Sequence, residues 1–465
     1  MSNRLSKGIQ MVFITNVIGM LFSLITNFAL PKYTSIETYA EIRTYQLYVT
    51  YIGVLHLGYI DGVYLKYGGR ELSAILPDDL ARQHHTLFCF QLFATLLLAV
   101  PSVITRNVTL AAFTLSVLPF NMAQYYKLLY QATGEFSRYS ILMNLTSLFI
   151  FLANLAMLFV FRAQSHATFL AGYVLVYLVI WVISEVQFGR LPRRESRSTG
   201  AWREMCSNIK SGVLLMLGNF SSILLTSIDR WFVMFFLDTQ AYALYSFAVS
   251  IENMLNVVVT PISTTLYNYC CINRDDKQIR GMRDYILLFA VAVIASAFPA
   301  SFIVNGFLTK YVGALSVVFF LFAAQIFFII IKSLFVNLYK AKHMQRVYFV
   351  KLFASLGFGV VANIVGFLCL KSKEAFAIGT MLSAVFWFLI CMPDFPEVTF
   401  SLKHLQYLFF ETALFLACGL LMSWWSGLLV YILGSVALSM IYMRNPFVGF
   451  MKTVFRMLSN HEWRK

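Results

Sequence analysis

Six charged side chains lie inside long apolar runs or at the mouth of one, where a charge is costly and therefore informative. Three are basic, and guanidinium and ammonium groups bind anions such as phosphate oxygens. Three are acidic, and a carboxylate in a membrane can take up a proton or a cation. The pattern predicts a cationic site for an anionic, hydroxyl-rich molecule, built beside ion-accepting carboxylates. The six residues are Arg43, Asp61, Asp229, Arg230, Glu252 and Lys332.

Uncharged polar residues extend this predicted site. At 100° per residue, the polar positions of the run 208–236 fall within an arc of about 100° that also contains Asp229 and Arg230. A shift of 203 residues maps this stripe onto the first run, where the matching positions are again polar or small. Packing between helices through small and hydroxyl residues is the alternative interpretation. The predicted lining residues are Asn16, Ser23, Thr26, Asn27, Thr50, Asn219, Ser222, Thr226 and Asn256.

Several of these positions also allow a purely structural role. Lys332 could extend its ammonium group to the membrane surface. His56 shares a face with Tyr45, Tyr48 and Tyr59, and we expect it to be a hydrogen-bonded core residue rather than a proton relay. That tyrosine face suits packing and anchoring at the interface, or stacking against a sugar.

The composition shows which elements must position these residues. Of 465 residues, 59% are hydrophobic and 12% are charged, whereas soluble domains carry about 25% charged residues. A soluble enzyme, a nucleic-acid binder and a disordered scaffold are therefore excluded. About fourteen apolar runs are each long enough to cross a bilayer. They span about 8–30, 44–65, 86–105, 108–130, 139–161, 167–188, 208–236, 242–268, 286–305, 312–339, 347–370, 375–391, 405–422 and 427–443.

An internal repeat divides these runs into two halves. The tetrapeptide LYQA at 129–132, followed by Tyr139, matches LYKA at 338–341, followed by Tyr348. The matching runs are six apart, an even number, so the halves insert in the same orientation. We therefore expect an all-α polytopic membrane protein with two parallel six-helix repeats and two C-terminal helices around a central cavity. The expected parts are an N-terminal half 1–188, a cytoplasmic linker 189–207, a C-terminal half 208–391, and an extra helix pair with a basic tail 392–465.

The net charge of +15 follows largely from membrane orientation. With the N-terminus in the cytoplasm, about 27 of the 36 basic residues fall on the cytoplasmic side, as the positive-inside rule requires. Both termini are then cytoplasmic. The seven cysteines show no metal-binding or disulfide spacing, and there is no phosphate-binding Walker motif, so neither a metal nor ATP is expected.

Three segments resemble the multidrug/oligosaccharidyl-lipid/polysaccharide exporter superfamily, and within it the bacterial O-antigen and polysaccharide flippases. IDRWFVMFFLD at 228–238 is followed by YALYSFA at 242–248 and VVVTPIS at 257–263, which is similar to the span-seven and span-eight pattern of that group. LYQATGEFSRYS at 129–140 and LGYIDGVYLKYGGR at 57–70 are similar to its span-four and span-two exits. Ala241 stands where the group usually has glycine. The resemblance covers about 1–400.

The resemblance implies a transporter rather than an enzyme. It implies that undecaprenyl-pyrophosphate-linked oligosaccharides move from the cytoplasmic to the periplasmic leaflet of the bacterial inner membrane, by alternating access and with an ion gradient as the usual driving force. H+ and Na+ both remain open as the coupling ion, and no other cofactor is expected. Membrane lipid, a polysaccharide polymerase and a chain-length regulator are the expected partners, and nucleic acid is not.

Two rival functions remain. A multidrug or cation antiporter of the same superfamily would need an acidic, aromatic pocket, whereas the charge inside these runs is mixed and tends to be basic. A membrane polymerase or ligase would need a sizeable external loop, and the external loops here are about a dozen residues or fewer by the run boundaries.

Overall fold

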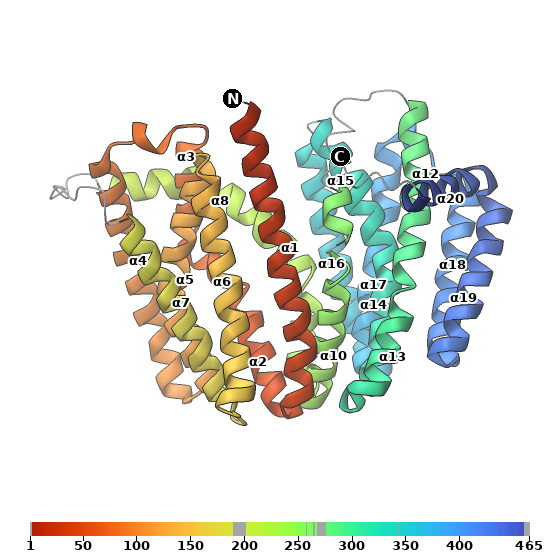
Figure 1. Cartoon of the computed structure of the whole chain (residues 1–465), viewed down its shortest axis with the longest axis horizontal. Helices are drawn as coiled ribbons and strands as arrows, with labels where there is room; N and C mark the ends of the chain where they lie inside the picture. Colours follow the sequence, from red (N-terminus) through yellow and green to blue (C-terminus); the bar gives the residue numbers. More distant parts are fainter. Residues whose placement is uncertain are drawn as a thin grey trace. The chain divides into compact units, whose positions relative to one another are not determined.

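The computed structural model describes residues 2–188, 201–256, 258–263, 266, 276–342 and 344–459. All regular elements of this part of the chain are helices. The chain forms two compact units, Met1–Ser227 and Ile228–Lys465 (Figure 1).

The first unit contains eight α-helices, short 3-10 segments η1 and η2, and a π-helical segment η3 among the described residues. In chain order they are α1 (Ser2–Tyr33), α2 (Ile36–Val49), η1 (Ile52–His56), α3 (Tyr59–Tyr67), η2 (Leu72–Ala74), α4 (Pro77–Thr105), α5 (Val108–Ala132), α6 (Phe136–Leu155), η3 (Ala156–Val160), α7 (His166–Phe188) and α8 (Ala201–Leu225).

The second unit begins with the helix that follows α8. Its described elements are α9 (Ile228–Phe236), α10 (Thr239–Asn253), α12 (Asp276–Ile294), α13 (Ala297–Phe307), η4 (Thr309–Ala314), α14 (Leu315–Ile330), the π-helical η5 (Ile331–Phe335), α15 (Val336–Ala341), α16 (Gln345–Leu370), α17 (Lys373–Cys391), η6 (Met392–Asp394), η7 (Pro396–Val398), α18 (Leu402–Leu421), α19 (Trp424–Tyr442) and α20 (Arg444–Ser459).

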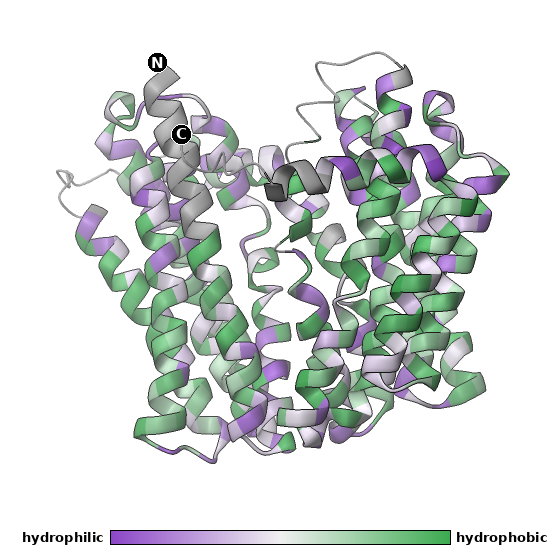
Figure 2. Cartoon of the chain, turned by 45° about the vertical axis from the view of Figure 1, so that its right-hand side comes forward, coloured by the Kyte–Doolittle hydropathy of each residue, from purple (hydrophilic) through white to green (hydrophobic). Residues whose placement is uncertain are grey.

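The helices have the surface of a membrane protein. Nine helical stretches in the described residues are long and apolar enough to span a bilayer. Large apolar side chains point outward, such as Ile104 at 75% and Leu421 at 84% exposure. Hydrophobic residues cover the middle of the helices and hydrophilic residues gather toward their ends (Figure 2). The prediction of an all-α polytopic membrane protein is confirmed.

The second predicted run is not one straight helix. It is divided into α2, η1 and α3, and the break between η1 and α3 contains two left-handed residues, Leu57 at φ 50° and Gly58 at φ 83°. Glycine adopts this conformation without strain, whereas leucine does not. Helix α3 begins at Tyr59, after this break.

The seventh predicted run is also interrupted. A turn at Thr226 and Ser227 separates α8 from α9, and the division between the two units falls at this turn. The expectation of a single polar stripe along one continuous helix is therefore wrong, because the 100° step is lost at the turn. Helix α8 already begins at Ala201, inside the segment 189–207 that the sequence suggests as a linker.

Glycines bring α8 against α3 at backbone contact. A Cβ on Gly62 would lie 2.0 Å from the carbonyl oxygen of Asn208, and one on Gly212 would lie 2.1 Å from the carbonyl oxygen of Gly58. Only hydrogen fits at these positions. This crossing makes α8 an integral part of the first unit.

Candidate functional site

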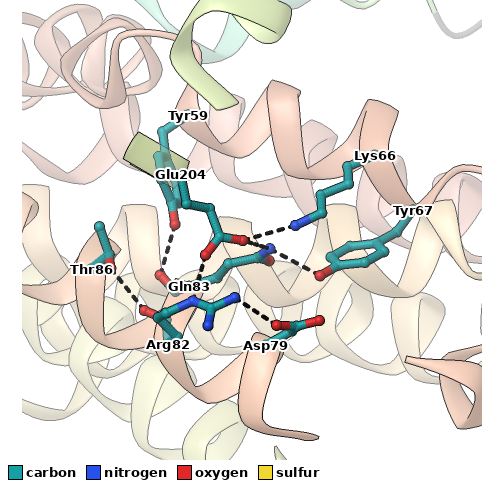
Figure 3. Close-up of polar contacts among 8 residues, drawn as sticks. All are labelled: Tyr59, Lys66, Tyr67, Asp79, Arg82, Gln83, Thr86 and Glu204. Atoms are coloured by element: carbon teal, nitrogen blue, oxygen red, sulfur yellow. Dashed lines mark hydrogen bonds and ion pairs between the residues drawn. The ribbon is translucent and has the colours of Figure 1, made fainter. Parts of the chain in front are cut away.

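Glu204 of α8 is the centre of a polar cluster at the ends of α3 and α4 (Figure 3). Its carboxylate accepts hydrogen bonds from Lys66 Nζ at 2.8 Å, Arg82 Nε at 2.6 Å and Gln83 Nε2 at 2.8 Å. Gln83 also donates to the Tyr67 hydroxyl at 2.9 Å, and Arg82 donates to Asp79 at 2.6 Å. Three helices are thus connected by one carboxylate.

The cluster stabilises Glu204 in its charged form. Burial raises the pKa of this carboxyl group, but the hydrogen bonds from Gln83, Lys66 and Arg82 outweigh burial and lower the pKa to about 2. From the sequence alone, Glu204 falls within the expected linker 189–207. An acidic residue in a strongly basic segment was the available signal. The cluster holds α8 to the first unit.

A cavity of about 650 Å³ lies within the first unit. Two predicted lining residues, Thr50 of α2 and Asn219 of α8, share it with the predicted ion-coupling residue Asp61 of α3. The structure therefore brings these three residues together, although the second predicted run is broken into α2, η1 and α3. The remaining polar lining side chains are His56, Tyr64, Gln124 and Gln131.

His56 and Asp61 form a buried pair at the edge of this cavity. Their exposed fractions are 4% and 6%, and Nε2 of His56 lies 3.8 Å from Oδ2 of Asp61. The backbone N–H of Gly58 donates to Nδ1 of His56 at 3.1 Å. His56 is thus hydrogen-bonded in the core, as the sequence suggests, and also lines the cavity.

Arg43 joins the predicted stripes of spans one and two. Its guanidinium donates to Oδ1 of Asn27 at 3.0 Å and to Oε1 of Gln46 at 2.7 Å, and it lies 4.8 Å above the ring of Tyr39. Its Nε has no hydrogen-bond partner among the described residues. These contacts hold a cation in place and leave its buried Nε–H without a partner in the described chain.

Asp229 and Arg230 begin α9 in the second unit. Oδ2 of Asp229 accepts a hydrogen bond from the Tyr245 hydroxyl at 2.6 Å, and its Oδ1 accepts one from the backbone N–H of Arg230 at 2.8 Å. Thr380 of α17 lies 3.4 Å from the same carboxylate. Arg230 is half-buried, and its Nε has no hydrogen-bond partner in the described part of the chain. Asp229 is therefore well anchored, whereas the buried Nε–H of Arg230 is unsatisfied by any described residue.

Lys332 lies in the π-helical segment η5, between α14 and α15. Such segments are common at functional sites because they interrupt the regular pattern of backbone hydrogen bonds. Its Nζ lies 5.6 Å from the centre of the Phe328 ring and interacts electrostatically with Glu252. Glu252 accepts a hydrogen bond from Gln325 of α14. In the described residues, Lys332 has no carboxylate within ion-pair distance.

The other predicted lining residues have varied surroundings. Ser23 accepts a hydrogen bond from Asn27 at 3.4 Å, and Asn256 donates to Asn253 at 3.2 Å. Thr226 is exposed at the turn after α8, and Thr26 is half-buried in α1. The side chains of Asn16 and Ser222 lie outside the described residues.

Each unit thus offers chemistry of two kinds. Arg43 in the first unit, and Arg230 and Lys332 in the second, can bind phosphate oxygens through charge-assisted hydrogen bonds. Asp61 and Glu252 can accept a cation or a proton beside them.

The fold is similar to that of known transporters. The lipid II flippase MurJ, in an inward closed conformation, superimposes with a TM-score of 0.71 at 12% identity, covering 93% of this chain and 99% of that one. An inward-facing multidrug resistance MATE transporter of the MOP superfamily gives 0.50 at 13% identity, covering 82% and 95%. No protein-family model and no curated protein matches the sequence. The chain therefore has the fold of MurJ and the MATE transporters.

Proposed function

We propose that this protein is a flippase for lipid-linked oligosaccharides. It moves an undecaprenyl-pyrophosphate-linked repeat unit of the O-antigen type from the cytoplasmic to the periplasmic leaflet of the bacterial inner membrane. Both of its termini lie in the cytoplasm, and transport proceeds by alternating access, driven by an ion gradient.

One observation carries this proposal: the basic residues inside the helices have N–H groups or charges that no described acceptor or ion pair satisfies. In the described residues, Nε of Arg43 and of Arg230 has no hydrogen-bond partner, and Lys332 has no ion-pair partner. A cation that no ion pair neutralises is costly in a membrane, and binding an anion removes that cost. A pyrophosphate supplies that anion. Tyrosine and amide side chains near these basic residues, such as Tyr39, Asn27 and Gln46 around Arg43, suit the hydroxyl groups of the sugars.

The physical task explains why a protein is needed. Each unsatisfied polar group costs several kcal/mol in hydrocarbon, and the core to be crossed is about 30 Å thick. Fixed cations and polar side chains replace water around the headgroup. The polyprenyl tail stays in lipid. The fold of the lipid II flippase MurJ supports a lipid-linked substrate.

The proposal is tested by deleting the gene and supplying variants. Deletion should leave lipid-linked repeat units on the cytoplasmic leaflet and remove the surface polysaccharide. A gene encoding Arg230→Ala should insert normally and fail to restore it, whereas Arg444→Ala, at an exposed basic residue of α20, should restore it fully. Normal surface glycan in the deletion strain, with no second transporter present, would refute the proposal.

A multidrug or cation antiporter is the second candidate. The buried carboxylate of Asp229, the half-buried carboxylate of Glu252 and the similarity to a MATE fold favour it. An antiporter predicts that the deletion strain becomes sensitive to cationic dyes while its surface glycan stays intact. A flippase predicts the opposite pair of results. If it acts as a flippase, a polymerase and a chain-length regulator are the partners that use its product.

A further inference from the structure

The buried pair His56 and Asp61 is separate from the basic residues assigned to the substrate. It lies at the break between η1 and α3 and faces the cavity of the first unit. We propose that Asp61, with His56 beside it, is a proton-binding site that takes H+ and not Na+. The proton site rests on the proposed function, in which an ion gradient drives transport. It identifies H+ as the coupling ion and Asp61 as the residue that binds it.

The hydrogen bond to Nδ1 decides which form His56 adopts. The backbone N–H of Gly58 donates to Nδ1 at 3.1 Å, so Nδ1 must be an acceptor and carry no proton. The ring proton is then on Nε2, the nitrogen that faces Asp61 at 3.8 Å. A second proton on Nδ1 would point at the Gly58 N–H. His56 therefore stays a neutral donor, and an incoming proton goes to Asp61.

The backbone around the pair is fixed by the crossing of α3 and α8. Leu57 and Gly58 both have positive φ, and a Cβ on Gly58 would lie 2.6 Å from the backbone nitrogen of Val213. A left-handed leucine is strained, and such strain is concentrated at functional sites. The crossing keeps the Gly58 N–H in place and with it the orientation of the imidazole.

The helices around the pair offer polar but uncharged groups to the cavity. They are Thr50 from α2, Gln124 and Gln131 from α5, and Asn219 from α8. On α4, Gln91 is engaged with the carbonyl oxygen of Leu55 at 3.3 Å. Tyr64 of α3 is the further titratable group that lines the cavity in the described chain. The charged residues nearest in sequence on the neighbouring helices, Lys127, Glu204 and Lys210, do not line it.

The position of His56 favours a proton over a sodium ion. A hard cation such as Na+ is bound by several oxygen ligands. The Nε2–H of a neutral imidazole faces Asp61 where Na+ would need a further oxygen ligand, whereas a proton needs only one carboxylate oxygen. The cavity of about 650 Å³, with seven polar side chains in its lining, gives water, and hence protons, access to the carboxyl group.

Infrared difference spectra of the full-length protein in liposomes test the site without any substrate. Acidification should produce the C=O stretching band of a protonated carboxyl group, and Asp61→Asn should abolish the Asp61 component. Glu252→Gln, which alters a carboxyl group in the second unit, should keep that component. Replacing K+ by Na+ in the buffer should not move its midpoint. A spectrum unchanged by Asp61→Asn, or a midpoint that falls with Na+, overturns the proposal.

Two His56 variants test the positioning role. Gln places an amide nitrogen near the position of Nε2, whereas Asn places one near Nδ1. His56→Asn should therefore raise the midpoint of the Asp61 band by about one pH unit or more, because the charged carboxylate loses the positive end of the imidazole dipole beside it. His56→Gln should stay near the native midpoint. Equal midpoints in all three proteins would refute the role of His56.

These spectra also separate this inference from the proposed function. If the band behaves as expected and the gene deletion leaves surface glycan intact, the flippase proposal fails and the proton site stands. If the band is unaffected by Asp61→Asn while the deletion strain lacks glycan, the proton site fails and the flippase proposal stands.

Discussion

The crossing of α3 and α8 allows a quantitative prediction for Gly212→Ala. The new Cβ would lie 2.1 Å from the Gly58 carbonyl oxygen and 2.2 Å from the Gly62 nitrogen, and both are backbone atoms that cannot rotate away. Carbon needs about 3.5 Å to a non-bonded neighbour, so the two helices must separate by more than about 1 Å.

The free-energy cost follows from this separation. Overpacking a core costs about 1–3 kcal/mol, and two backbone clashes place Gly212→Ala at the upper end of that range. For a unit of 227 residues, about 3 kcal/mol corresponds to a fall in Tm of about 6–12 °C. Opening the crossing also loosens the contacts of Glu204, so the loss is cooperative.

Thermal unfolding of purified protein in detergent, followed by tryptophan fluorescence, measures the effect. Gly53→Ala is the matched control, because a Cβ at Gly53 meets nothing within 4 Å. The control should keep the native Tm. If Gly212→Ala unfolds within about 2 °C of the native protein, the backbones are not in contact and the inclusion of α8 in the first unit is incorrect.

Three further predictions follow from the polar contacts. Glu204→Gln should lower Tm at pH 7, because Lys66 and Arg82 lose their shared counter-charge. The native protein should show a matching fall on acidification: a pKa near 2 against an ordinary 4.5 means that this stabilisation is complete above pH 4.5 and is lost as pH falls toward 2. Arg43→Lys should insert normally but restore little surface glycan, since an ammonium group cannot hold Asn27 and Gln46 in the same fork and still present a free donor. Lys332→Met should keep the native Tm or raise it, because burying the cation is costly, while abolishing glycan export. Full export by that variant would show that Lys332 is not a ligand for the substrate.

Helix content and the membrane class could be predicted from the sequence because apolar length alone decides both. Polar residues inside apolar runs were also informative: Thr50, Asp61 and Asn219 line one cavity although the second run is broken, and Arg43 contacts Asn27. In these cases one physical rule applies: a polar side chain inside an apolar run faces the protein interior or a cavity rather than lipid.

The helix breaks could not be predicted in the same way. Leu57 adopts a left-handed conformation that its residue type disfavours, and the turn at Thr226 and Ser227 has neither glycine nor proline. Tertiary packing holds both in place: the hydroxyl groups of Tyr51 and Ser227 lie 2.5 Å apart. Glu204 was missed for a related reason. Its three donors come from distant parts of the chain, and only the folded structure brings them together.

The attachment of α8 to the first unit separates two boundaries that are easily assumed to coincide. The repeat in the sequence suggests an ancestral duplication that joined two equal halves near residues 189–207. The compact units instead meet at Ser227 and Ile228. Helix α8, which the repeat assigns to the C-terminal half, thus belongs to the first compact unit. A chain divided for coexpression at 189–200 should reassemble through α3 and α8, with each fragment supplying part of one body. A division between residues 227 and 228 would instead cut the peptide bond that joins the two compact units.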